Sequence, residues 1–173
     1  YNPENGKFSK PGTSIKYNSL NKTLYTDKNG WLWISRKNID ILSTITGKYI
    51  TKSVRASNNN YSSIVGICED EKNQMWLASV REGLYIIDPQ RKKYDAIRHN
   101  PSNQNSINSH QLKSIYKDNS GVIWVGSQNE GINKYDPNRK KFKEYTPEIN
   151  AHKQRANRSV KSIYQDKDGF YWI

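Results

Sequence analysis

The chain has 173 residues, 34% of them hydrophobic, and its 28 lysines and arginines outnumber 16 acidic residues to give a net charge of +12. No apolar run approaches the length of a membrane span, and a single cysteine, Cys68, excludes a disulfide within the chain and is expected to be a small buried apolar residue. The basic residues are scattered through turns and no nucleic-acid-binding signature is present. We therefore expect a solvated basic surface and no nucleic-acid partner.

The segments predicted in chain order are short strands separated by turns. Residues 1–8 superpose on residues 135–142, so residues 1–10 are expected to be the last strand of a preceding sheet. Four-stranded sheets are expected over 19–54, 64–98 and 112–145, and the first half of a further sheet over 160–173. Within these sheets, strands are predicted over residues 20–26, 31–35 and 49–54, and over residues 162–164 and 170–173 near the end. Polar crossings, such as the asparagine-rich run 55–63, connect the sheets.

A repeated aspartate and tryptophan organise these segments. Each aspartate precedes a tryptophan by six residues, and the tryptophans are separated by 43, 48 and 48 residues. The four pairs are Asp27 with Trp33, Asp70 with Trp76, Asp118 with Trp124, and Asp166 with Trp172. A constant period of this length is typical of repeat architectures. We interpret the aspartates as turn residues that accept backbone N–H groups and the tryptophans as packing between sheets, rather than as acids or sugar platforms.

The turn between each aspartate and tryptophan needs a residue with positive φ. Glycine supplies it at Gly30, Gly121 and Gly169, and Asn73 takes that place in the second copy. Asparagine is the residue that best tolerates this conformation after glycine. Four short strands per period joined by such turns predict an all-β chain built of propeller blades, each a four-stranded antiparallel sheet.

The strand count predicts about three and a half blades and an incomplete ring. Propellers need roughly four to eight blades to close, so we expect a piece of a longer propeller, or one that closes with another copy of the chain. A four-bladed ring, with residues 1–10 docking beside the last blade, is an alternative. The open strand edge at 170–173 predicts self-association when the piece is made alone.

Catalytic and metal-binding patterns are nearly absent from the sequence. The histidines, His99, His110 and His152, lie in or beside crossings without the spacing of a metal site. A nucleophile elbow, a phosphate loop and a dinucleotide fingerprint are also missing. We therefore expect no enzyme activity, metal or cofactor, and only His110 is placed to serve a propeller lyase or hydrolase.

The third unit carries a resemblance to a known family. The pattern SIYKDNSGVIWVGSQNEGINKYDPNRKKFKEY and its lead-in NSINSHQLKSIY resemble the two-component regulator propeller repeat. The resemblance implies the periplasmic sensor domain of a hybrid two-component system histidine kinase. Such a domain would bind an oligosaccharide, including an acidic one, and signal to a kinase outside this chain. Its partners would be the rest of the parent propeller or another copy, and the membrane would be reached only through the parent protein.

Propeller ligands usually bind the face built by the loops between second and third strands together with the crossings between blades. The candidate ligand-binding residues there are Arg36, Arg81, Glu82, Asn108, His110, Gln128, Asn129 and Glu130. Their amide and charged groups suit the bidentate hydrogen bonds that vicinal hydroxyls or a uronate form. Two alternatives stay open: these residues are solvated turn residues, or the chain is a scaffold for protein–protein interaction.

Overall fold

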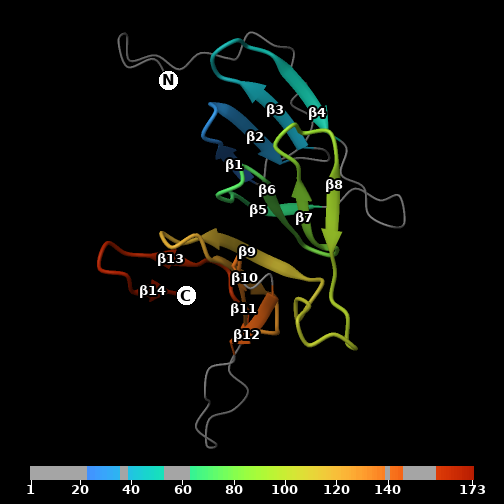
Figure 1. Ribbon diagram of the computed structural model, residues 1–173, viewed down its shortest axis with the longest axis vertical. Coiled ribbons are helices and arrows are strands. Elements are labelled where there is room, and N and C mark those ends of the chain that lie inside the picture. Colours follow the sequence, from blue (N-terminus) through green and yellow to red (C-terminus); the bar gives the residue numbers. More distant parts are fainter. Residues whose placement is uncertain (1–22, 36–38, 53–62, 139–140, 146–158) are drawn as a thin grey trace, which may run out of the picture.

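The computed structural model describes residues 23–35, 39–52, 63–138, 141–145 and 159–173 (Figure 1). The strands of its first sheet are β1 (Thr23–Thr26), β2 (Trp31–Ser35), β3 (Ile39–Ser43) and β4 (Tyr49–Lys52). The second sheet contains β5 (Ile64–Glu69), β6 (Met75–Ser79), β7 (Gly83–Ile87) and β8 (Tyr94–Ile97). The third contains β9 (Leu112–Lys117), β10 (Ile123–Ser127), β11 (Ile132–Asp136) and β12 (Lys141–Tyr145). A last hairpin pairs β13 (Tyr164–Gln165) with β14 (Tyr171–Trp172).

Each four-stranded sheet is antiparallel, with its strands in sequence order. The first strands β1, β5 and β9 are neighbours along the stack, and the sheets do not close into a ring (Figure 1). Among the described residues no helix occurs. The prediction of an all-β chain of propeller blades is therefore confirmed. The strand expected over residues 1–10 and the asparagine-rich crossing 55–62 lie outside the described residues.

The hairpin turns form as their sequence predicts. Asn73 has a φ of 59°, and the glycines that replace it in the other copies have φ values of 73°, 84° and 88°. In every copy one oxygen of the aspartate, Oδ1, accepts from the backbone N–H groups two and four residues later, as Asp27 does from Asn29 and Trp31 at 3.0 Å. The aspartate thus stabilises the turn that begins β2, β6, β10 or β14.

The repeated tryptophans pack between neighbouring sheets where a following sheet is present. Trp33 is fully buried in a cluster with residues of the second sheet, including Ile64 and Leu77. Trp76 is 2% exposed and packs with the third sheet, whereas Trp172 is 65% exposed. The expected packing role is confirmed for Trp33 and Trp76, and among the described residues no sheet covers Trp172.

The last hairpin is shorter than expected from the sequence. Residues 162–163 precede β13 instead of belonging to it, and Phe170 and Ile173 lie outside β14. Its ladder has two residue pairs, Tyr164 with Trp172 and Gln165 with Tyr171. A two-stranded ribbon gains little stability without further strands, which accounts for the short ladder.

Candidate ligand-binding surface

The crossing between the second and third sheets joins two loops that carry predicted site residues. One loop, residues 80–82, connects β6 to β7, and the other, residues 128–131, connects β10 to β11. The carbonyl of His110 accepts from the N–H of Gly83 at 2.9 Å, and the carbonyl of Gln111 accepts from the N–H of Gln128 at 2.9 Å. Adjacent residues of one crossing therefore hold both loops.

This arrangement brings most of the predicted residues together. We call the resulting strip the loop surface, formed by Arg81, Glu82, His110, Gln128, Asn129 and Glu130. Arg81, His110, Asn129 and Glu130 are exposed, and Glu82 and Gln128 are half-buried. Arg36 lies outside the described residues, and the structure gives no account of it.

Charges on the loop surface are partly paired. Glu82 accepts from the guanidinium of Arg98 at 3.4 Å. The backbone N–H of Arg81 donates to Ser79 Oγ at 3.2 Å, while its side chain forms no ion pair with any described residue. The guanidinium of Arg81 is thus the solvated cation of this strip, and a guanidinium binds carboxylates and paired hydroxyls in a bidentate manner.

Asn108 holds the crossing in place through its carboxamide. Its Oδ1 accepts from Ser127 Oγ at 2.7 Å and from Asn133 Nδ2 at 2.6 Å, and its Nδ2 donates to the carbonyl of Glu130. The N–H of Asn108 in turn donates to Asn133 Oδ1 at 2.9 Å. Because these bonds use its polar groups, Asn108 positions the loop surface and has little capacity left for a ligand.

Asn133 is a positioning residue of this surface that the sequence did not indicate as a candidate. It lies within β11 and is 1% exposed. The sequence did carry a signal, since Asn133 pairs with Val125 at the register where Tyr85 pairs with Leu77 in the second sheet. A buried asparagine in a strand position of this kind needs a polar partner, and the partner is Asn108.

His110 of the loop surface packs against a second histidine, His99. The rings of His99 and His110 are 5.7 Å apart, edge to face, and His99 Nδ1 lies 2.8 Å from the carbonyl of Ile107. His99, Asn108 and Glu130 line a cavity of about 200 Å³. A larger cavity of about 420 Å³ adjoins it along β11 and β12, where Lys134, Lys143 and Tyr145 contribute. In the described part of the chain no three His, Cys, Asp or Glu side chains are grouped to hold a metal ion.

The repeated aspartates carry a second contact that the sequence did not predict. In each copy Oδ2 accepts from the indole N–H of the tryptophan six residues later, at 2.9, 3.0, 2.8 and 2.9 Å in chain order. Burial alone would raise the pKa of Asp27, but hydrogen bonds from Trp33, Trp31 and Arg91 outweigh it and hold that pKa below its ordinary value. Bonds from Tyr171, Ser120 and Trp124 do the same for Asp118, again against burial. Ionised acceptors of this kind stabilise the turns and are poor general acids.

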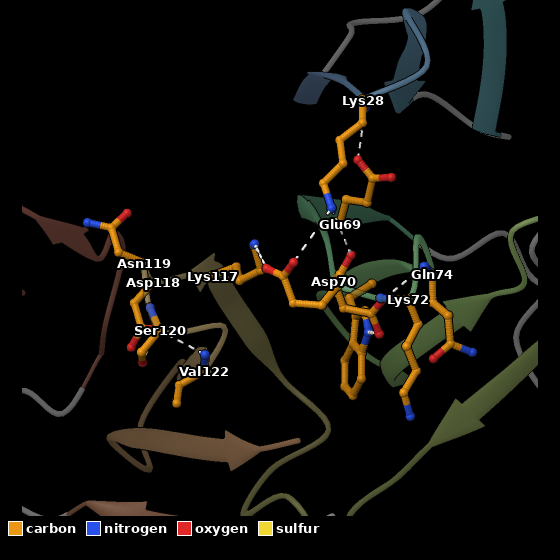
Figure 2. A network of polar contacts seen from close by, with 12 residues as sticks. Lys28, Glu69, Asp70, Lys72, Gln74, Lys117, Asp118, Asn119, Ser120 and Val122 are labelled. Atoms are coloured by element: carbon orange, nitrogen blue, oxygen red, sulfur yellow. Dashed lines mark hydrogen bonds and ion pairs between the residues drawn. The ribbon is translucent and has the colours of Figure 1, made fainter. Parts of the chain in front are cut away.

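Neighbouring sheets also contact one another at these turns (Figure 2). The backbone N–H of Lys28 donates to Glu69 Oε2 at 2.9 Å, and the Lys28 ammonium lies 3.9 Å from Glu71. Lys117 of the third sheet forms an ion pair with Glu71, in the turn between β5 and β6, at 2.5 Å. These polar contacts between sheets lie at the hairpin turns, and the loop surface is a separate set of residues.

Comparison with known proteins agrees with this architecture. Residues 106–129 match the family model of the two component regulator propeller, which confirms the resemblance of the third unit. No curated protein sequence matches the chain. None of the described residues forms a helix long and apolar enough to cross a membrane.

Solved structures show the same fold at low sequence identity. The extracellular domain of the hybrid two component system BT3049 from B. thetaiotaomicron aligns with a TM-score of 0.71 and 18% identity over 89% of this chain and 22% of that one. The extracellular domain of the one component system BT4673 from the same organism gives 0.67 and 18%, over 92% and 20%. Virginiamycin B lyase from Staphylococcus aureus gives 0.65 and 13%, over 92% and 50%. The chain thus spans about a fifth of the length of the two extracellular domains that it resembles.

Proposed function

We propose that this chain is part of an extracytoplasmic sensor propeller that binds an oligosaccharide at the loop surface and signals to a histidine kinase elsewhere in its parent protein. One observation carries the proposal. The segment that matches the regulator propeller family, residues 106–129, contains Asn108, His110, Gln128 and Asn129, and it is the segment that ties the two loops together. The extracellular location of the two similar sensor domains supports the same placement for this chain, in the periplasm.

The chemistry of the loop surface suits a sugar. Amide groups at Gln128 and Asn129 donate and accept at once, as neighbouring hydroxyls require. The solvated guanidinium of Arg81 matches a carboxylate or a pair of hydroxyls, so an oligosaccharide with an acidic residue is the ligand class we favour. The His110 ring contributes an exposed flat surface between the loops.

Binding to a panel of neutral and uronate-containing oligosaccharides, followed by isothermal titration calorimetry, tests this proposal. The double variant Arg81→Ala, Gln128→Ala is expected to lose affinity by about tenfold or more, because each removed hydrogen bond to a charged or polar ligand group is worth roughly 1 kcal/mol. A matched control is Lys92→Ala, Lys93→Ala, which removes two exposed cations from the turn between β7 and β8 and leaves the loop surface intact. Unchanged affinity in the double variant would remove Arg81 and Gln128 from the site, and no binding to any oligosaccharide would refute the function.

We infer further that binding occurs without chemistry on the ligand. The fold is shared with a lyase, but a shared fold does not carry an activity. After incubation with the bound oligosaccharide, mass spectrometry should return it intact. Cleavage that disappears in His110→Ala would support a lyase or hydrolase instead.

A further inference from the structure

In two copies of the turn, a donor from the following sheet or hairpin reaches Oδ2 of the aspartate, the oxygen that already accepts from the tryptophan. Asp27 Oδ2 accepts from Trp33 Nε1 at 2.9 Å and also from Nη2 of Arg91, in the second sheet, at 2.6 Å. Asp118 Oδ2 accepts from Trp124 Nε1 at 2.8 Å and also from the hydroxyl of Tyr171, in the last hairpin, at 2.5 Å. Arg91 follows β7 and Tyr171 lies in β14, so the two donors occupy unrelated positions of the repeat.

Each donor also packs against an aromatic ring beside its aspartate. The Arg91 guanidinium lies 4.9 Å from the ring centre of Trp31 and 5.6 Å from that of Trp33. The Tyr171 ring lies 4.9 Å from that of Trp124. A donor with a flat face therefore covers the aromatic surface and delivers a hydrogen bond to the carboxylate, which is stronger because the acceptor is charged.

A second contact recurs at the same interfaces. The N–H of the residue after the aspartate donates to the side chain that precedes the next aspartate: Lys28 to Glu69 Oε2 at 2.9 Å, and Asn119 to Gln165 Oε1 at 3.3 Å. At these two interfaces the following sheet thus supplies both a donor for the aspartate and an acceptor for its neighbour. The third sheet packs on the face of Asp70 without either contact in the described residues, because Oδ2 of Asp70 accepts from Trp76 Nε1 alone and the residue before Asp118 is Lys117, whose side chain only donates.

The last hairpin presents the same face uncovered. Asp166 Oδ1 accepts from Asp168 N at 3.0 Å and Phe170 N at 2.9 Å, and Oδ2 accepts from Trp172 Nε1 at 2.9 Å, as in the other copies. No second donor reaches Oδ2 from the described residues. We call the face formed by Tyr164, Asp166, Phe170 and Trp172 the hairpin surface; its three aromatic residues are 60%, 69% and 65% exposed in chain order.

We propose that the hairpin surface binds a following sheet of the same propeller, and that this sheet places an arginine or tyrosine donor on Asp166 Oδ2 and a glutamate or glutamine acceptor beside the N–H of Lys167. Among the described residues the chain has three equivalent faces, those of Asp27, Asp70 and Asp118, and each is covered by the sheet or hairpin that follows it. Two of them, at Asp27 and Asp118, hold it through a second donor on Oδ2, which argues for this occupant over an apolar ligand. An apolar ligand would cover Trp172 but leave the carboxylate oxygen beside it without its second donor.

Extending the chain tests this directly. A copy of residues 126–172 is added after Ile173, which continues the repeat because Ile173 follows Trp172 as Val125 follows Trp124. The copy brings a second Gln165 and a second Tyr171 to the positions that the proposal requires. Fluorotryptophan NMR, with Trp172→Phe to assign its signal, is expected to show that Trp172 loses its solvent isotope shift in the extended chain.

A matched control carries phenylalanine in place of the second Tyr171. It is expected to keep Trp172 buried but to unfold at lower urea concentration than the extended chain, and the difference should vanish when Asp166 is also changed to Asn. An equal midpoint for the two extended chains, or a solvent-exposed Trp172 in a folded extended chain, would overturn the proposal. Burial of Trp172 in the unextended chain at high concentration would assign the surface to a second copy and would overturn it too.

The existing chain supplies a second measurement that does not depend on folding of the extension. Asp118→Asn, Tyr171→Phe and the double variant form a thermodynamic cycle at the filled site. The two changes are expected to be non-additive in urea midpoint, because Tyr171 donates to Asp118 Oδ2. Additive effects would refute the acceptor role of the aspartate on which the proposal depends.

Discussion

Replacing Asp27 by asparagine should destabilise the fold through two bonds on one oxygen. Oδ2 accepts from the indole N–H of Trp33, which is fully buried, and from the guanidinium of Arg91. Oδ1 accepts from two backbone N–H groups of the turn. If the oxygen of the asparagine keeps the two turn bonds, its NH₂ group faces the donors of Trp33 and Arg91, and both of their hydrogen bonds are lost.

The size of the effect follows from what is left unpaired. A buried N–H without an acceptor costs about 1–3 kcal/mol, and losing a hydrogen bond between charged groups costs about 1.5–3 kcal/mol. We therefore expect Asp27→Asn to lower the free energy of unfolding by about 3–5 kcal/mol. A loss this large is a substantial share of the stability of an ordinary domain.

Urea unfolding followed by circular dichroism measures this loss, with Asp166→Asn as the matched control. Asp166 makes the same turn and indole bonds, but its tryptophan is 65% exposed, so water can replace the lost acceptor. The midpoint should fall clearly for Asp27→Asn and little for Asp166→Asn. Equal shifts for the two variants would refute the reasoning from burial.

The same variant should change the response to acid. The pKa of Asp27 is held below its ordinary value of 3.8 because hydrogen bonds outweigh the opposing effect of burial. The stability that this shift contributes is fully present above the ordinary pKa and is lost as pH falls through the lowered one. The native chain should therefore lose more of its urea midpoint between pH 5 and pH 2, roughly, than Asp27→Asn does. An identical loss in both would show that Asp27 does not contribute.

Three further measurements check other parts of the structure. Gly83→Ala should lower the free energy of unfolding, measured in urea, by more than twice as much as Gly47→Ala. Both glycines have positive φ, at which an alanine costs about 1–2 kcal/mol, but only at Gly83 would the added Cβ lie 2.3 Å from the carbonyl oxygen of Ile97. Equal losses for the two variants would contradict this. Burial, aided by Asp70, raises the pKa of the Cys68 thiol, so Ellman's reagent at pH 8, roughly, should react only after denaturation; rapid reaction of the native chain would be inconsistent with that burial. Asn108→Ala should lower stability by about 2 kcal/mol, because buried polar partners lose their bonds, and an unchanged thermal midpoint would argue against its positioning role.

Local features of the fold could be predicted because each depends on residues close in sequence. The turn after Asp70 needs only an acceptor and a residue that tolerates positive φ, and Asn73 meets that need at 59°. The period of the tryptophans similarly revealed the repeat and hence the propeller blades. The candidate site was predicted from a general property of propeller loops, and the loops at 80–82 and 128–131 do lie on either side of one crossing.

Contacts between residues distant in sequence could not be predicted in this way. Nothing local to Asp27 indicates Arg91, which is 64 residues away, and nothing local to Asp118 indicates Tyr171, 53 residues away. Both contacts exist because the sheets stack at a particular distance and rotation. The distance and rotation between the sheets are determined by many side-chain contacts across the interfaces.

The same division holds for the loop surface. The sequence shows which side chains can form hydrogen bonds, and on that basis Asn108 and Gln128 were equal candidates for binding a ligand. Only the packing of the crossing against β11 shows that the carboxamide of Asn108 is hydrogen-bonded to Asn133 and Ser127, whereas the Arg81 side chain is exposed to solvent. Turn chemistry is encoded within a few residues, but whether a polar group is available to a ligand depends on what the rest of the chain brings next to it.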